Sequence, residues 1–563
     1  MRLRPIHFVA LAAAAFLGLF FLYPIGLVLV GGVTDSEGGF TTLYLAAVFT
    51  NPVYREGLIN AALIATATTT LSVLLGLPPA WLAARYDFPL KGLFSGLLLV
   101  PMVLPPFVGA VGLQHLLARS GGPVNLLLHR LGILETPEFD WFGQAKFAGV
   151  VMLEALHLYP IIYLNAAAAL ANIDPALEQA ARNLGASGWT LFRRITLPLI
   201  TPGLFAGATL VFIWSFTELG TPLMFDYRRV TPVQIFDGLN SIADNRYPFA
   251  LAIVLLLAAG ALYSAGRFAF GGRDFATVPK ATTASRERRP PAWAQAAIVA
   301  LFCGVIGLAL VPHAGVVLTS VAGRWYGTLL PDPITAEHYR NALEHPLTVP
   351  AISNSIRLSF AATLVDLVLG LAIAWIVVRS KTAGGRALDA LAMLPLAVPG
   401  LVTAFGYLAA TRTWPMSALD PRVDPTAILI IAYSVRRLPY VVRSAVGGLQ
   451  QTPAALEEAA ANLGAGPATV LRRITAPLIS ANLIAGGLLA FSFAMLEVSD
   501  SLILAVRQPD YPITKAIYEL SARLGDGPYI AAALGVWAMA LLTLTLLTAS
   551  LLLGKRLGAI FKA

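Results

Sequence analysis

The sequence predicts an all-α membrane protein of twelve transmembrane helices, arranged as two parallel six-helix repeats, and three observations carry this prediction. First, the 563-residue chain is 57% hydrophobic and only 12% charged, with a mean hydropathy of +0.74, whereas soluble domains carry about 25% charged residues. Second, apolar stretches that match the roughly 20 residues of a spanning helix recur along the chain. Third, one polar segment occurs twice, at an offset of 279 residues.

Twelve apolar stretches are the candidate spans. The first six lie near 8–31, 57–84, 93–117, 147–171, 199–222 and 248–266, and the second six near 294–320, 350–378, 388–410, 426–449, 479–503 and 531–554. The first stretch is too long for the apolar core of a signal peptide, which has about 7–15 residues. We therefore expect an uncleaved span, with Arg2 and Arg4 on the cytoplasmic side.

Basic residues set the expected orientation, because loops on the cytoplasmic side of a membrane carry an excess of Lys and Arg. If both termini are cytoplasmic, the basic loops all fall on that side; they contain Arg85, Lys91, Arg182, Arg193, Arg194, Arg267, Arg273, Lys280, Arg286, Arg288, Arg289, Arg379, Lys381, Arg386, Arg472 and Arg473. The opposite loops are longer and more acidic. A multi-pass protein with both termini in the cytoplasm is the prediction.

The repeat extends through both halves of the chain. Residues Asn60, Gly76, Trp81 and Arg85 recur 294 positions later as Asn354, Gly370, Trp375 and Arg379. Since each half has an even number of spans, both copies enter the membrane from the same side, which makes them parallel repeats. We expect a first half over 1–266, a polar cytosolic linker over 267–291 and a second half over 292–563.

The duplicated polar segment carries the functional signal. Residues 177–198 and 456–477 are identical at 14 of 22 positions. An acid in the first helical turn favours a helix N-terminus, and glycine allows the left-handed geometry that ends a helix. Positive-inside arginines account for a basic loop, but they do not account for a Glu–Ala–Ala pattern followed by Gly in both copies; these residues are Glu178, Ala181, Gly185, Glu457, Ala460 and Gly464.

This pattern resembles the EAA loop of permease subunits of type I ABC importers, and the resemblance covers nearly the whole chain. It implies the permease fold of that class, in a bacterial inner membrane, with EAA loops at 174–198 and 453–477 acting as coupling helices. The implied partners are two copies of a cytosolic ABC ATPase and a periplasmic substrate-binding protein. The sequence has no GxxxxGK[ST] loop to bind phosphates, so ATP and magnesium are expected on the ATPase. The permease itself would be no enzyme and would bind no cofactor.

Ionisable and hydroxyl groups inside the spans are candidates for a translocation pathway, because burying a charge in a bilayer is costly. The candidates are Glu154, His157, Tyr159, Glu218, Tyr433, Arg436, Glu497 and Asp500. Two interpretations stay open. These groups line the pathway, or they pair across the two halves, for example Glu497 with Arg436, and only hold the bundle together. No metal site is predicted.

The substrate is only partly indicated. The segments 159–164 (YPIIYL) and 432–439 (AYSVRRLP) resemble the ferric-iron branch of these importers. Permeases for phosphonates, sugar phosphates, thiamine and polyamines share the architecture. The mid-membrane arginines would suit an anion, and the carboxylates a cation. An ion-coupled secondary transporter is the remote alternative, against which the duplicated cytosolic loop argues. The net charge of +9 indicates basic cytoplasmic loops of a protein in a lipid membrane, and we expect no binding to nucleic acid.

Overall fold

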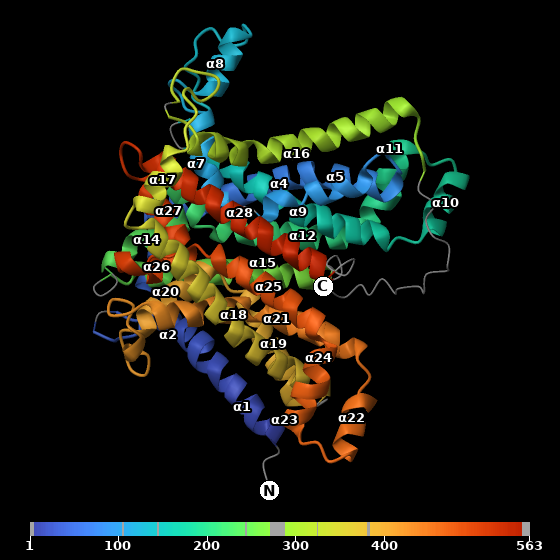
Figure 1. Cartoon of the computed structure of the whole chain (residues 1–563), viewed down its shortest axis with the longest axis vertical. Helices are drawn as coiled ribbons and strands as arrows, with labels where there is room; N and C mark the ends of the chain where they lie inside the picture. The colour runs from blue at the N-terminus through green and yellow to red at the C-terminus, as the bar shows by residue number, and fades with distance from the viewer. Residues whose placement is uncertain are drawn as a thin grey trace.

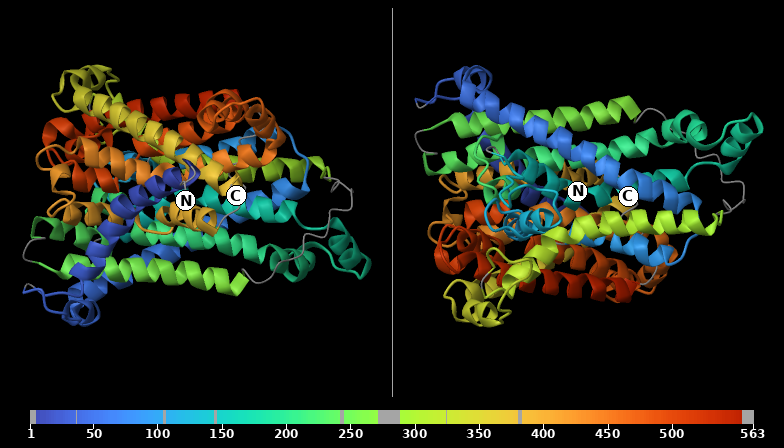
Figure 2. Two further views of the ribbon diagram at one scale, coloured as in Figure 1. Left: turned by 90° about the horizontal axis from the view of Figure 1, so that it is seen from below. Right: turned by 90° about the horizontal axis from the view of Figure 1, so that it is seen from above.

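The structure is a computed structural model that describes residues 5–35, 37–103, 106–143, 146–241, 245–270, 288–323, 325–379 and 383–553. Helices make up the architecture, and within those ranges β pairing is limited to three isolated bridges. Long helices lie side by side in one bundle, and short helices gather at its ends (Figure 1; Figure 2). The all-α prediction is confirmed.

The first half contains long helices connected by short ones. Its helices are α1 (Pro5–Leu17), η1 (Gly18–Leu22), α2 (Tyr23–Gly31), α3 (Leu43–Thr50), α4 (Pro52–Arg85), α5 (Lys91–Leu97), α6 (Val100–Val103), α7 (Pro106–Leu116), α8 (Pro123–Arg130), α9 (Phe147–Ala171), α10 (Pro175–Asn183), α11 (Gly188–Leu191), η2 (Phe192–Thr196), α12 (Leu197–Thr217), α13 (Gly220–Met224), α14 (Thr231–Asp237), η3 (Gly238–Ser241) and α15 (Tyr247–Phe270).

The second half repeats this order. Its helices are α16 (Ala292–Ser320), α17 (Glu337–Glu344), α18 (Thr348–Arg379), α19 (Ala383–Met393), η4 (Leu394–Leu396), α20 (Gly400–Ala410), η5 (Ser417–Leu419), α21 (Thr426–Gln451), α22 (Ala455–Asn462), α23 (Pro467–Val470), η6 (Leu471–Thr475), α24 (Ala476–Leu478), α25 (Ser480–Met495), α26 (Ser499–Leu504), η7 (Gln508–Asp510), α27 (Ile513–Ser521) and α28 (Gly527–Leu553). The predicted linker 267–291 falls mostly on 271–287, which lie outside the described residues, as do Arg2 and Arg4.

The twelve predicted spans are all helical, but not all are single straight helices. Among the residues that the structure describes, seven helices are long and apolar enough to cross a membrane, and ten spans result if three bent helix pairs count as one span each. The other two predicted spans correspond to α15, whose apolar part is short, and to α21, which carries three arginines. The candidate spans near 93–117 and 388–410 correspond to two of the bent pairs, and the third pair bends at the start of the candidate span near 479–503.

Proline accounts for one of these breaks. Helices α19 and α20 form a pair bent by 101°, with Pro395 inside η4 and Pro399 at the N-cap of α20. Proline has no N–H to donate and its ring clashes with the preceding turn, so a helix ends or kinks there. The sequence shows these prolines, but it does not show how far the chain turns at them. The break between α24 and α25, bent by 79°, has no proline at its junction residue, Ile479.

The first long helices of the two halves are exchanged. Helices α1 and α2 pack on α18, α19 and α20 of the second half, and α16 packs on α7, α4 and α9 of the first. Glycines allow the closest approaches: a methyl group on Gly112 of α7 would overlap backbone atoms of Pro312 and Val316. At the equivalent position, 294 residues later, a methyl on Gly406 of α20 would lie 2.9 Å from the Pro24 carbonyl oxygen. The halves therefore interlock.

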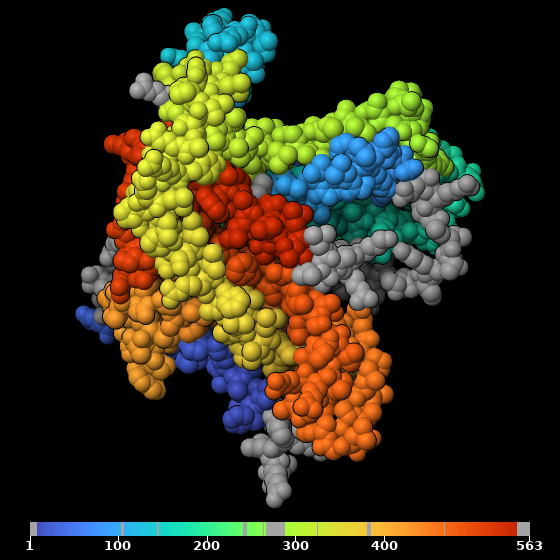
Figure 3. Space-filling model, in the orientation of Figure 1, coloured from blue at the N-terminus to red at the C-terminus, as the bar shows by residue number. Residues whose placement is uncertain are grey.

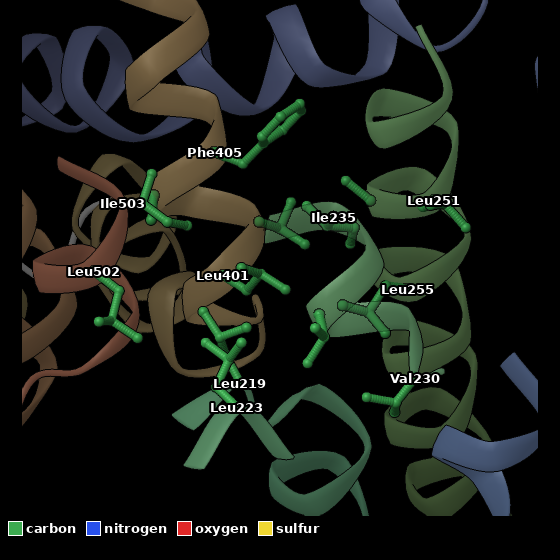
Figure 4. Close-up of a cluster of buried hydrophobic side chains, with 14 of the residues drawn as sticks. Leu219, Leu223, Val230, Ile235, Leu251, Leu255, Leu401, Phe405, Leu502 and Ile503 are labelled. Atoms are coloured by element: carbon green, nitrogen blue, oxygen red, sulfur yellow. The ribbon is translucent and has the colours of Figure 1, made fainter. Parts of the chain in front are cut away.

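A buried apolar core joins the halves at the end of the bundle opposite α10 and α22. Figure 4 shows its side chains converging from helices of both halves, with Leu223 and Ile235 from the first half and Leu401, Phe405 and Leu502 from the second. All five are at most 6% exposed. Burying such side chains stabilises by about 1.5–3 kcal/mol each. This core closes that end of the bundle.

We expect Gly112→Ala to destabilise the protein, because the added methyl must push α7 and α16 apart. Overpacking of this kind costs about 1–3 kcal/mol. Thermal unfolding in detergent, followed by tryptophan fluorescence, should show a lower midpoint. The matched control is Gly304→Ala in α16, where a methyl meets no atom within 4 Å and helix propensity favours alanine. An unchanged midpoint for Gly112→Ala would contradict the close packing.

Candidate functional sites

The two duplicated segments fold alike; we name residues 174–198 the first coupling segment and 453–477 the second. Each begins with a helix, α10 or α22, that ends at a glycine with a positive φ, +87° at Gly185 and +86° at Gly464. The next backbone N–H donates to the alanine five residues back, Ala186 to Ala181 and Ala465 to Ala460, at 2.9 and 3.1 Å. Together with the i→i−3 bonds from the glycine N–H groups, these form a Schellman motif. The predicted glycine turn is confirmed in both copies.

The glutamate of each segment is tied to the transmembrane bundle. Glu178 forms an ion pair with Arg85, the last residue of α4, and accepts a hydrogen bond from the Thr196 hydroxyl at 3.1 Å. The Glu178 and Arg85 side chains are 15% and 14% exposed. An acid at this position therefore fixes the orientation of α10 on the bundle; it is not presented to a partner.

The second segment repeats this arrangement. Arg379, the last residue of α18, donates to Glu457 at 3.0 and 3.2 Å, and Thr475 donates to Glu457 at 3.0 Å. Both threonines end five-residue π-helices, η2 and η6, that lead into the following span. After the glycine turn of the first segment, α11, η2 and α12 run on as one 30-residue helix.

Each segment presents leucines to solvent. Leu184 and Leu463, which precede the glycines, are each 89% exposed, and Leu177 and Leu456 are 50% and 46% exposed. By contrast Ala181 is buried. Both segments lie at the same end of the molecule, at the right in Figure 1, and the second forms a distinct lobe at the lower right of Figure 3. Exposed leucines held on rigid helix ends are suited to protein contacts.

A cavity of about 160 Å³ lies between the two halves. Five of the predicted pathway residues line it: Glu154, His157, Glu218, Arg436 and Glu497. The sequence prediction omitted several further lining residues, of which Arg437, Trp214, Phe493 and Gly400 are the most prominent. Tyr159, Tyr433 and Asp500 are buried but do not line it. Tyr159 donates to the Leu98 carbonyl at 2.8 Å, and the Tyr433 hydroxyl lies 2.6 Å from that of Ser501.

The cavity wall contains a charged cluster. Glu497 pairs with both Arg437 and Arg436, with 3.2 Å between Arg436 Nη1 and Glu497 Oε1. Glu497 and Arg436 are therefore paired as expected, but both belong to the second half, so this pair does not join the two halves. Arg437 was not foreseen as a second partner. Among the described residues, no ion pair is found for the equivalent acid of the first half, Glu218; its Oε1 accepts backbone N–H bonds from Gly220 and Thr221 at 3.0 and 3.3 Å.

Two of the bent helix pairs, Lys91–Met102 with Pro106–Leu116 and Gly384–Leu396 with Gly400–Ala410, contribute to the cavity wall near their breaks. His157 Nδ1 lies 2.8 Å from the Pro101 carbonyl oxygen. The equivalent residue 279 positions later is Arg436, whose guanidinium packs so closely on Gly400 that a methyl group there would overlap it. Gly400 begins α20 just after its break. One polar side chain in each half therefore contacts the chain where the neighbouring helix bends, and any change in the bend moves the cavity wall.

The comparisons with known proteins agree with this geometry. The family of binding-protein-dependent transport system inner membrane components matches residues 72–271 and 366–552, one copy in each half. The chain belongs to this family. The two matched regions include both coupling segments and every residue named above as lining the cavity.

Individual relatives match over different lengths. A putative ferric transport system permease protein of Haemophilus influenzae is 27% identical over 82% of this chain and 70% of its own length. The ferric transport system permease protein of Actinobacillus pleuropneumoniae is 27% identical over 86% and 68%. The molybdenum transport system permease protein of Escherichia coli is 37% identical, but over only 32% of this chain and 74% of its own length.

Removing the arginine that holds a coupling segment should loosen it. In Arg85→Ala the Glu178 carboxylate loses its ion pair, which costs about 1–3 kcal/mol for a largely buried partner. We expect faster hydrogen exchange across 175–196, and the equivalent Arg379→Ala should have the same effect across 455–475. Arg193→Ala, an exposed arginine of the same segment, is the control. Unchanged exchange in Arg85→Ala would show that the ion pair does not hold the segment.

Arg436→Ala separates the two interpretations of the charged cluster. Glu497 keeps Arg437 as a partner, so we expect the thermal midpoint to fall little while transport falls tenfold or more and ATPase activity persists. The control is Arg443→Ala, which lies on the same helix and pairs with Asp389 at 3.5 Å. If Arg436→Ala unfolds readily and the double variant Arg436→Ala/Glu497→Gln regains both stability and uptake, the cluster is structural.

Proposed function

We propose that this chain is the permease of an ATP-driven importer of ferric iron. One observation carries the importer function: the transport-system family matches both halves, and each half carries a coupling segment with the same glycine turn and the same Arg–Glu–Thr anchor. Two docking points of one design suit two copies of one ATPase. ATP and magnesium are assigned to that ATPase, and this chain supplies the pathway.

The proposed orientation places both coupling segments and both termini in the cytoplasm. Exposed arginines at 193, 194, 472 and 473 stand at the end of the bundle that bears α10 and α22, as expected for a cytoplasmic face. A periplasmic substrate-binding protein would then dock at the opposite end. Labelling of Leu184→Cys in a Cys303→Ser background tests this orientation, because reagent reaching it from the periplasmic side would reverse it.

Two observations support ferric iron as the substrate. The relatives that match more than four fifths of the chain are named for ferric transport. The carboxylates of Glu154, Glu218 and Glu497 are oxygen ligands of the kind that hard cations prefer.

A molybdenum oxyanion is the second candidate. Relatives named for molybdenum transport match about a third of the chain at 37% identity, and the two arginines of the cavity wall, Arg436 and Arg437, could hold an oxyanion by charge-assisted hydrogen bonds. These arginines are already paired with Glu497, however. We therefore place this candidate second.

Reconstituted transport distinguishes the candidates. Proteoliposomes that contain the permease, its ATPase and its binding protein, with ATP enclosed, should accumulate radioactive iron supplied as a ferric chelate. They should not accumulate molybdate. Glu218→Gln should lower iron uptake tenfold or more, because it removes a carboxylate that lines the cavity; Glu218→Asp, which keeps a carboxylate there, should retain most of the uptake. Uptake of molybdate in place of iron would overturn the substrate, and ATP-independent uptake of either ion would overturn the importer.

A further inference from the structure

The two coupling segments have one backbone design but different exposed side chains. The exposed leucines and the glycine turn are common to both. Among the equivalent positions that differ, three change the charge or remove a tryptophan. Trp189 corresponds to Ala468, Arg182 to Ala461, and Gln179 to Glu458. The first segment therefore adds a large aromatic and a cation where the second has two alanines and an anion.

Trp189 is presented as a rigid contact. Its ring stacks on Phe192, with centroids 5.3 Å apart and planes at 28°, and Phe192 packs in turn on Trp81. One face of the indole is thus supported by the bundle, yet the residue is 70% exposed. Side chains held in this way lose little entropy on binding, and tryptophan is among the residues most enriched in interface hot spots.

The position of Trp189 points to a protein partner and away from lipid. Arg193 and Arg194 follow it on the same continuous helix and are exposed. Basic residues next to a span mark its cytoplasmic end. Trp189 is four residues before Arg193, about 6 Å farther from the membrane along a helix. It belongs to the same coupling segment as the exposed Leu184 and Leu177.

We propose that the ATPase subunit at the first coupling segment is bound more tightly than the identical subunit at the second. The inference rests on the proposed function, because it takes the ATPase as the occupant. Two identical subunits offer the same groove twice, and one groove cannot complement both the exposed anion Glu458 and the neutral Gln179 equally well. A tryptophan buries 150–250 Å² on contact, whereas the equivalent Ala468 buries far less. We expect at least a tenfold difference in affinity.

The experiment is a titration of the full-length permease in lipid nanodiscs with the nucleotide-free ATPase subunit of its own transport system, counted by native mass spectrometry. The wild-type chain should bind two copies with dissociation constants at least tenfold apart. Trp189→Ala should raise the dissociation constant of the tighter step about tenfold, so that the two constants become similar. Ala468→Trp should strengthen the weaker step. Trp414→Ala removes a tryptophan that is 84% exposed outside both segments and should change neither step.

The outcomes separate this inference from the proposed function. Two equal steps in the wild-type chain, or an unchanged tighter step in Trp189→Ala, would overturn the inference and leave the importer intact. Absence of any ATPase binding would overturn both. If Trp189→Ala is poorly folded, Ala468→Trp decides alone: a weaker step that gains no affinity would show that tryptophan at this position contributes nothing to docking.

Discussion

The requirement that a charge in an apolar bundle be paired organises this protein. Each coupling segment is joined to its own half by one arginine–glutamate pair at the end of a long helix, Arg85 with Glu178 and Arg379 with Glu457. Within the second half, Glu497 pairs with two arginines of α21. Removing one partner of such a pair is costly because the other charge stays buried. A pair therefore acts as a rigid joint, and motion of a coupling segment must be passed on to α4 or α18 without being absorbed locally.

The exchange of first helices limits what such motion can do. Since α1 and α2 pack on the second half and α16 on the first, neither half can move away from the other as a free body. The backbone contacts at Gly112 and Gly406 lie in the same relative place in both halves. Cores packed this closely shift between discrete arrangements and do not deform smoothly. The bends at α19–α20 and α24–α25, where helices are already interrupted, are the places where the chain can turn without breaking this packing.

The sequence predicts the parts of this structure that are local and repeated. The repeat, the glycine turns at 185 and 464, and the helical nature of all twelve spans follow from spacing and residue type. The angles of the bent helices could not be predicted, because a proline shows where a helix can break but does not determine how far the chain turns. The partner of Glu178 was missed because Arg85 lies 93 residues away, at the end of another helix. Only the recurrence of Arg85 at position 379, noted for the repeat, hinted at this pairing. Tyr159, Tyr433 and Asp500 were correctly placed inside the bundle, but hydrophobicity alone cannot tell which buried polar group faces a cavity.

The two halves keep a common backbone while their side chains have diverged, and part of this divergence lies at the functional surfaces. In the cavity, His157 of the first half stands where Arg436 stands in the second, and Glu218 accepts backbone N–H bonds while its counterpart Glu497 holds arginines. A two-fold site would present the same groups from both sides. Among the described residues that line this cavity, carboxylates come from both halves, whereas the arginines, Arg436 and Arg437, come from the second. Fusing the halves in one chain makes such asymmetry possible, because each copy can then change without altering the other. The structure therefore describes an importer pathway with a fixed, unequal arrangement of charges around its cavity.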